Sequence, residues 1–277
     1  QPGEVDMEAE STGPGGVPTP ADRARVVGQV LLVALAGLLV GSILYSVVAR
    51  IGASFGLVTI TDSGRLDTPV VVQFSVTVVF SGIGLALTTA GYLYARSEPL
   101  SFLDVSVPSL RDVGYTVGGL LGLFTLSVVV SLLFQFLGVQ SAPSGIETTV
   151  RETGATGALL VLAVLSILII GPGEELVYRN VIQKRLYDLF PRGQAILLAS
   201  VVFAAVHVLQ YLNSDPLQTL SALSVVFVLA LVLGFVYERT ENVVVPAVVH
   251  GLFNATQFLL LYVQITYDLQ PALLMPV

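Results

Sequence analysis

Residues 26–49 read VVGQVLLVALAGLLVGSILYSVVA and contain no Asp, Glu, Lys or Arg. A helix rises 1.5 Å per residue, so about 20 residues cross the hydrocarbon core of a bilayer. The run is apolar on all sides rather than along one stripe, which is typical of a helix surrounded by lipid. This stretch therefore predicts a transmembrane helix.

Six further runs lack the same four charged residue types, and each is long enough to cross the membrane. None shows the short segments of alternating polarity that a spanning β-barrel needs. The sequence therefore predicts an all-α fold, a polytopic transmembrane helical bundle with seven spans, or eight if the amphipathic segment 174–190 enters the bilayer. The six runs are 69–95, 113–146, 153–173, 193–214, 216–237 and 242–267.

The composition agrees with a chain whose outer solvent is lipid. Of the 277 residues, 54% are hydrophobic and only 11% are charged, against about 25% charged in a soluble domain. These values exclude an ordinary soluble globule and a disordered chain. The absence of cysteine excludes disulfides and thiolate metal sites. The net charge of −7 argues against nucleic acid, so the predicted partner is the lipid bilayer.

The chain divides into a short tail and one large domain. Residues 1–22 are acidic and rich in Pro, Gly, Ser and Thr, which predicts a disordered acidic tail. Residues 23–277 are expected to form a single polytopic membrane domain. Within it, Gly118 and Gly122 form a GxxxG pattern, which favours close helix packing.

Orientation follows from the Lys and Arg residues beside the spans, because cytoplasmic segments carry an excess of them. A cytoplasmic N-terminus puts nine of the twelve on the inner side, including those of the connection 174–192. We therefore predict that the N-terminus is cytoplasmic. The inner nine are Arg23, Arg25, Arg96, Arg111, Arg179, Lys184, Arg185, Arg192 and Arg239, and the outer three are Arg50, Arg65 and Arg151.

Two adjacent carboxylates follow an apolar run. Glu174 and Glu175 come directly after Gly171-Pro172-Gly173, where proline is expected to interrupt the helix and open space. Acidic residues in the first turn of a new helix are favoured by its dipole, and that alone explains one acid. Glu175 and Arg179 are four residues apart, so we expect them to form a buried ion pair. Glu174, near Tyr178, is left without a predicted cation and is a candidate functional residue.

Both histidines of the sequence fall within predicted spans. His207 follows Phe203 by four residues, and His250 precedes Asn254 by four, so each pair shares a helix face. Gly251 allows another backbone or a substrate to approach closely. Packing or interhelical hydrogen bonds would explain these polar residues. A functional site is the alternative, because polar groups at membrane depth are costly.

Together these clusters supply one acid, two imidazoles and one amide at membrane depth. A carboxylate and an imidazole can activate water as general bases, and imidazole and amide donors can stabilise an oxyanion. This inventory is typical of a hydrolase without a side-chain nucleophile.

The same residues resemble the CAAX protease and bacteriocin-processing (CPBP, or Abi) family of intramembrane glutamate proteases, whose type member is the Ras-converting CAAX endopeptidase. The family motifs EExxxR, FxxxH and HxxxN/D stand here as Glu174-Glu175-Leu-Val-Tyr-Arg179, Phe203-Ala-Ala-Val-His207 and His250-Gly-Leu-Phe-Asn254. The three occur in the family's order. The resemblance covers about residues 160–260 and implies a catalytic half of about 156–265.

The resemblance implies an endopeptidase in which Glu174 and His207 activate the attacking water and His250 and Asn254 form the oxyanion hole. It implies no covalent intermediate and no obligatory metal or other cofactor. Its best-known substrates are prenylated CAAX tails, so a membrane-associated, prenylated peptide or protein is a candidate partner. We expect the four catalytic side chains to meet in one cavity open to the cytoplasmic side. The residues expected to support them are Glu175, Arg179, Tyr178 and Phe203.

Other readings remain open. Glu174, His207 and His250 suit a catalytic zinc ion, which would make the enzyme a metalloprotease. A membrane scaffold or immunity-type protein could keep the fold without the activity, and a proton-linked transporter would use Glu174 differently, although the internal repeats typical of transporters are missing. The sequence lacks HExxH and GxGD motifs, and the GxSxG at 52–56 follows no strand.

Overall fold

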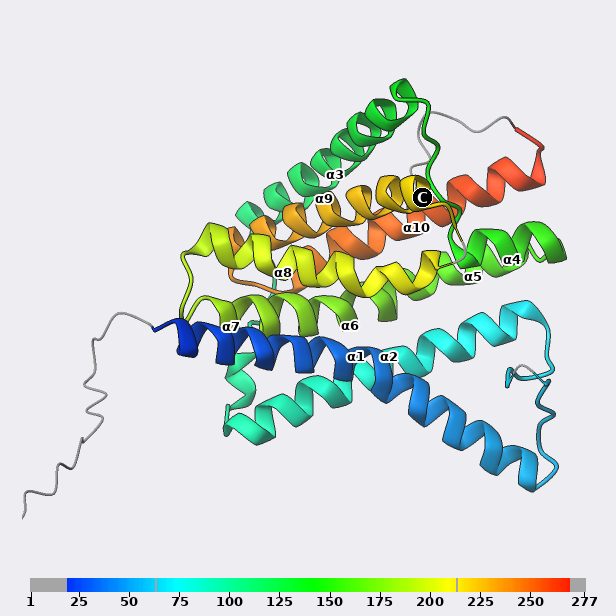
Figure 1. Ribbon diagram of the computed structural model, residues 1–277, viewed down its shortest axis with the longest axis horizontal. Coiled ribbons are helices and arrows are strands. Elements are labelled where there is room, and N and C mark those ends of the chain that lie inside the picture. The colour runs from blue at the N-terminus through cyan, green and yellow to red at the C-terminus, as the bar shows by residue number, and fades with distance from the viewer. Residues whose placement is uncertain (1–18, 63, 213, 270–277) are drawn as a thin grey trace, which may run out of the picture.

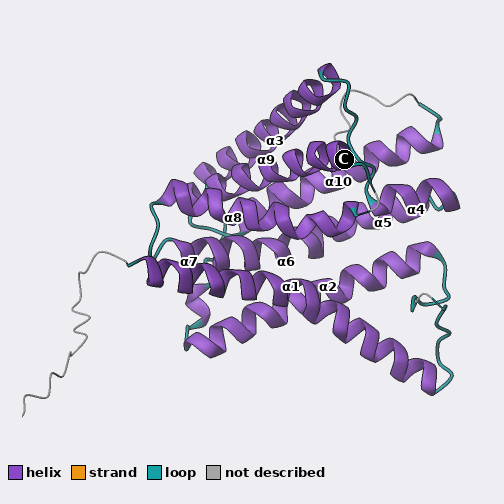
Figure 2. Ribbon diagram, viewed as in Figure 1, coloured by secondary structure: helices purple, strands orange, loops and turns teal. Residues whose placement is uncertain are grey.

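The computed structural model describes residues 19–62, 64–212 and 214–269 as a bundle of helices (Figures 1 and 2). Within these residues, seven helices are long and apolar enough to cross a membrane. No strand forms in the described ranges, where the only β-type pairing is an isolated bridge between Ile60 and Leu66. The predicted all-α polytopic bundle is therefore confirmed.

Six of the seven spans are built on one long helix each, and the fourth is a continuous series of shorter helical segments. The elements are α1 (Pro20–Ser54), α2 (Val70–Arg96), η1 (Leu100–Phe102), α3 (Leu110–Phe136), α4 (Gly145–Thr153), α5 (Gly157–Leu165), η2 (Ser166–Ile170), α6 (Gly171–Glu175), η3 (Leu176–Gln183), α7 (Lys184–Leu186), α8 (Arg192–His207), η4 (Val208–Tyr211), α9 (Pro216–Thr240) and α10 (Val244–Thr266). The fourth span runs from α5 to α7, and η4 extends α8 in the fifth.

The first span begins earlier than the sequence predicted. The Thr19 hydroxyl accepts a hydrogen bond from the Asp22 backbone N–H, and the Asp22 carboxylate accepts one from the Thr19 backbone N–H, so a capping box fixes the start of α1. Residues 20–22, expected in the tail, therefore belong to the helix. Residues 1–18 of the predicted tail lie outside the described residues.

The expected interruption at Gly171-Pro172-Gly173 does not occur. The chain stays helical through Pro172, with a π-helical segment on each side, η2 before it and η3 after it. Proline removes one i→i−4 hydrogen bond and crowds the carbonyl four residues back, and a wider π turn accommodates both. As a result, residues 174–186 continue the fourth span, so they form neither the predicted cytoplasmic connection nor an eighth span.

The bundle has two ends, which we name from the chain (Figure 1). At the N-terminal end, α1, α3, α8 and α10 begin and α2, α7 and α9 finish. Contacts tie these elements together there: Arg23 lies over the Phe190 ring, and Arg111 donates to the carbonyl of Arg239. The opposite end holds α4 and the starts of α2, α5 and α9, and the Ala142 amide donates there to the carbonyl of Gln218.

Two glycines bring α10 against the fourth span. A Cβ atom on Gly251 would lie 2.8 Å from Ile167 Cα, and one on Gly171 would lie 2.6 Å from the carbonyl oxygen of Ala247. Real Cβ contacts are never this short, so only glycine permits the approach. The sequence expectation of a close approach at Gly251 is met, and it places His250 beside the paired glutamates.

Candidate active site

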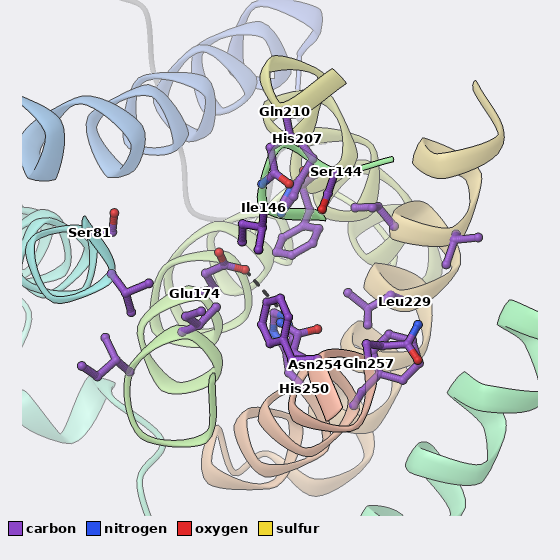
Figure 3. A pocket seen from close by; sticks show the side chains of 18 of the residues that line it. Ser81, Ser144, Ile146, Glu174, His207, Gln210, Leu229, His250, Asn254 and Gln257 are labelled. Carbon is purple, nitrogen blue, oxygen red and sulfur yellow. Dashed lines mark hydrogen bonds and ion pairs between the residues drawn. The ribbon is translucent and has the colours of Figure 1, made fainter. Parts of the chain in front are cut away.

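Glu174, His207, His250 and Asn254 line one cavity of about 250 Å³ (Figure 3). They come from three separate spans, through α6, α8 and α10. The sequence predicted this convergence from the cost of leaving each polar group alone in lipid, and the structure brings all four together.

Glu175 lies behind the cavity and holds two partners. Its Oε2 accepts from Arg179 Nε at 2.8 Å, and both side chains have 0% exposure. Its Oε1 is 2.9 Å from His250 Nδ1. The predicted buried ion pair is thus present. The contact with His250, 75 positions away, is one that sequence reasoning missed because no local spacing encodes it.

The carboxylate of Glu175 sets the orientation of the His250 ring. Since an ionised carboxylate only accepts, Nδ1 of His250 carries the proton in this contact. The other ring nitrogen, Nε2, points to Glu174 and lies 3.8 Å from its Oε2 (Figure 3). His250 therefore stands between two carboxylates, one buried and one in the cavity.

His207 is oriented by the backbone of its own helix. Its Nδ1 lies 2.7 Å from the carbonyl oxygen of Phe203, which can only accept. Nδ1 is therefore the donor, and Nε2 of the neutral ring keeps a free lone pair. A nitrogen in that state can take a proton from water.

An aromatic cluster supports this ring. The Phe203 ring lies 4.5 Å from that of His207, and Tyr178 contacts Phe203 edge-on at 4.9 Å. The guanidinium of Arg179 lies 5.2 Å from the centre of the same ring. Phe203 therefore separates the buried ion pair from His207, so Tyr178 and Phe203 are positioned to support the site by packing.

The cavity extends from Glu174 toward the opposite end of the bundle. Its lining there includes Ser144 and Ile146, before and within α4, and Gln210 of η4. Toward the N-terminal end lie the fully buried Glu175 and Arg179. The cavity lining therefore lies in the half of the bundle away from the N-terminal end.

Sequence reasoning also missed several lining residues. Ser144 and Ile146 precede the motif region and come from a connection that the sequence assigned to the third predicted run. Gln257 carried a usable signal, because it lies seven residues after His250 and therefore on the same helix face.

The three residues considered for a zinc site are of types that zinc accepts as ligands, but the structure does not group them as a metal site would require. Glu174, His207 and His250 line the same cavity. Among the residues that the structure describes, however, no three His, Asp or Glu side chains are grouped to hold a metal ion.

Comparison with known proteins gives one match. Residues 156–256 match the family model described as type II CAAX prenyl endopeptidase Rce1-like. The matched segment contains all three motifs, and with them Glu174, His207, His250 and Asn254. Searches of curated proteins and of solved structures found no match.

Proposed function

We propose that this integral membrane protein hydrolyses a peptide bond with an activated water molecule, because residues 156–256 match the family model of Rce1-like type II CAAX prenyl endopeptidases. The observation that carries the proposal is the meeting of Glu174, His207, His250 and Asn254 in one cavity between membrane spans.

In the proposed reaction, water lies between Glu174 and His207. The carboxylate, assisted by His207 Nε2, takes a proton as the water oxygen attacks the scissile carbonyl carbon. The carbonyl oxygen becomes an oxyanion. Asn254 and a protonated His250 Nε2 donate hydrogen bonds to it. The C–N bond then breaks, and the abstracted proton passes to the leaving amine.

Glu175 and Arg179 act through His250 in this scheme. His250 must present an N–H at Nε2 to stabilise the oxyanion, and a carboxylate at Nδ1 stabilises the imidazolium that results. Arg179 balances the charge of Glu175, which would otherwise be buried alone. We therefore assign both as positioning residues.

The substrate we propose is a membrane-associated peptide. Most of the cavity lining is apolar, and its described residues include no Lys or Arg, so it suits an extended apolar segment entering from the bilayer. Prenylated CAAX tails are the first candidates, because the family is named for them.

We further infer which side of the membrane the cavity faces. Eight Lys and Arg residues lie at the N-terminal end and three at the opposite end, while Arg179 is buried in the bundle. The excess of positive charge favours a cytoplasmic N-terminal end. If the cavity opens at the opposite end, the substrate segment would then enter from the extracytoplasmic side, whereas the sequence alone predicted a cytoplasmic opening.

A peptide panel tests the proposed activity. The purified protein in detergent would be incubated with farnesylated CAAX peptides and their unprenylated counterparts, with and without chelator, and the products identified by mass spectrometry. Cleavage at one bond that persists in chelator supports the proposal. No cleavage of any peptide would favour the scaffold or immunity-type alternative, and cleavage lost to chelator would favour the metalloprotease.

A further inference from the structure

Gln257 is a buried amide that the proposed mechanism does not use. Its side chain lies in α10, has 8% exposure and lines the catalytic cavity. Its Oε1 atom is buried and has no hydrogen-bond partner within the described part of the chain. Buried polar groups are normally satisfied, so an unsatisfied amide oxygen beside a cavity indicates a missing partner.

The position of Gln257 relates it to the proposed chemistry. His250, Asn254 and Gln257 follow one face of α10 and line the same pocket (Figure 3). Because α10 begins at the N-terminal end, Gln257 lies further toward the opposite end than Asn254. Gln257 lies three positions after Asn254, which corresponds to a helical rise of about 4.5 Å. An extended chain advances about 3.3 Å per residue, so Gln257 is one to two substrate residues from the oxyanion donors.

We propose that Gln257 is a substrate-positioning residue whose amide hydrogen-bonds the backbone of the bound peptide next to the scissile bond. This rests on the proposed function. An extended peptide in an apolar cavity presents an N–H and a C=O at each residue, and none can be left unpaired without cost. A carboxamide suits this task because it both accepts and donates. It also makes no demand on the substrate's side chains.

Gln264 provides a matched control. It lies on the same helix, seven residues further, and also has 8% exposure. It is not among the residues that line the cavity. Replacement of either glutamine by leucine removes a buried amide of similar size, so a general effect on packing would appear in both variants.

The test compares Gln257→Leu with Gln264→Leu. The probe is a dansyl-labelled peptide ending in a farnesylated CAAX tail, with its unprenylated counterpart as the second arm. Loss of one hydrogen bond is expected to raise KM about tenfold, with a smaller change in kcat. Gln264→Leu is expected to stay within about twofold. Equal effects in the two variants would overturn the proposal.

A backbone-modified peptide separates positioning from packing. Replacing the amide next to the scissile bond by an ester removes its N–H. The wild type should bind this ester more weakly than the amide peptide, whereas Gln257→Leu should bind both alike. Both proteins carry Glu174→Gln in this experiment, so that binding is measured without turnover. An ester penalty of equal size in both proteins would overturn the proposal, while failure of every peptide to bind the wild type would overturn the proposed function with it.

Discussion

At the scale of single residues, Glu174 and Glu175 differ although they are neighbours. Glu175 is fully buried and bonds Arg179 and His250, while Glu174 faces the cavity with 21% of its side chain exposed. The sequence predicted the ion pair from the spacing of four residues. It could not predict the contact with His250, because that depends on how α10 packs against the fourth span.

Arg179→Ala should strongly destabilise the protein, because it leaves the Glu175 charge buried without its ion-pair partner. We expect a loss of roughly 3–5 kcal/mol in the free energy of unfolding, measured by equilibrium unfolding in detergent.

Arg151→Ala is the matched control. Arg151 pairs with Glu147 at the same spacing and the same 2.8 Å, but 42% of its side chain is exposed. Its loss should cost about 0.3–0.5 kcal/mol. An Arg179→Ala protein as stable as Arg151→Ala, yet inactive, would mean that Arg179 takes part in the chemistry.

At the scale of elements, the glycine patterns of the sequence predicted only part of the helix packing. The GxxxG pair of α3 predicted close packing, but a Cβ atom on Gly118 or Gly122 would meet no atom within 4 Å. Gly119, between them, is the residue that packs, against Val236 and Val249. Sequence spacing identifies a small-residue face, but the partner that covers it is decided by tertiary packing. Likewise, the Gly-Pro-Gly motif correctly indicated an irregular helix at residues 171–173. It did not indicate that the helix continues beyond these residues.

Gly251→Ala should separate α10 from the fourth span. The added Cβ atom would lie 2.8 Å from Ile167 Cα and 2.9 Å from the Ser166 carbonyl oxygen, and backbone atoms cannot move aside locally. We expect His250 to shift relative to Glu174, and kcat to fall by about a hundredfold, since misplacement by about 1 Å costs that much.

Gly118→Ala is the control for this prediction. Its Cβ atom would enter open space, and alanine favours the helix by up to about 1 kcal/mol over glycine. Its activity should match that of the wild type. Equal activity of Gly251→Ala and the wild type would show that the close helix approach does not position the site.

At the scale of the whole molecule, hydropathy predicted the seven spans because each run must meet lipid along its length. It could not predict the side of the cavity opening, since that depends on which ends of the helices diverge around the site. The absence of cysteine in the sequence makes this orientation measurable, because a single introduced thiol reports one position.

We predict that a membrane-impermeant maleimide added to intact cells labels Gln210→Cys in the cavity and Asp62→Cys in the connection after α1. Ser97→Cys and Gln194→Cys, exposed at the N-terminal end, should be labelled only after permeabilisation. The reverse pattern would show that the cavity opens to the cytoplasm. It would also show that the excess of Lys and Arg at the N-terminal end does not predict the orientation of this protein.

The proposed role of Glu174 is tested most directly by the turnover of Glu174→Gln on a peptide that the wild type cleaves, measured in the presence of chelator. Glutamine keeps the shape of the side chain but cannot accept a proton from water, so we predict a folded protein with no detectable cleavage. Substantial cleavage by Glu174→Gln would contradict the assignment of Glu174 as the base that activates water.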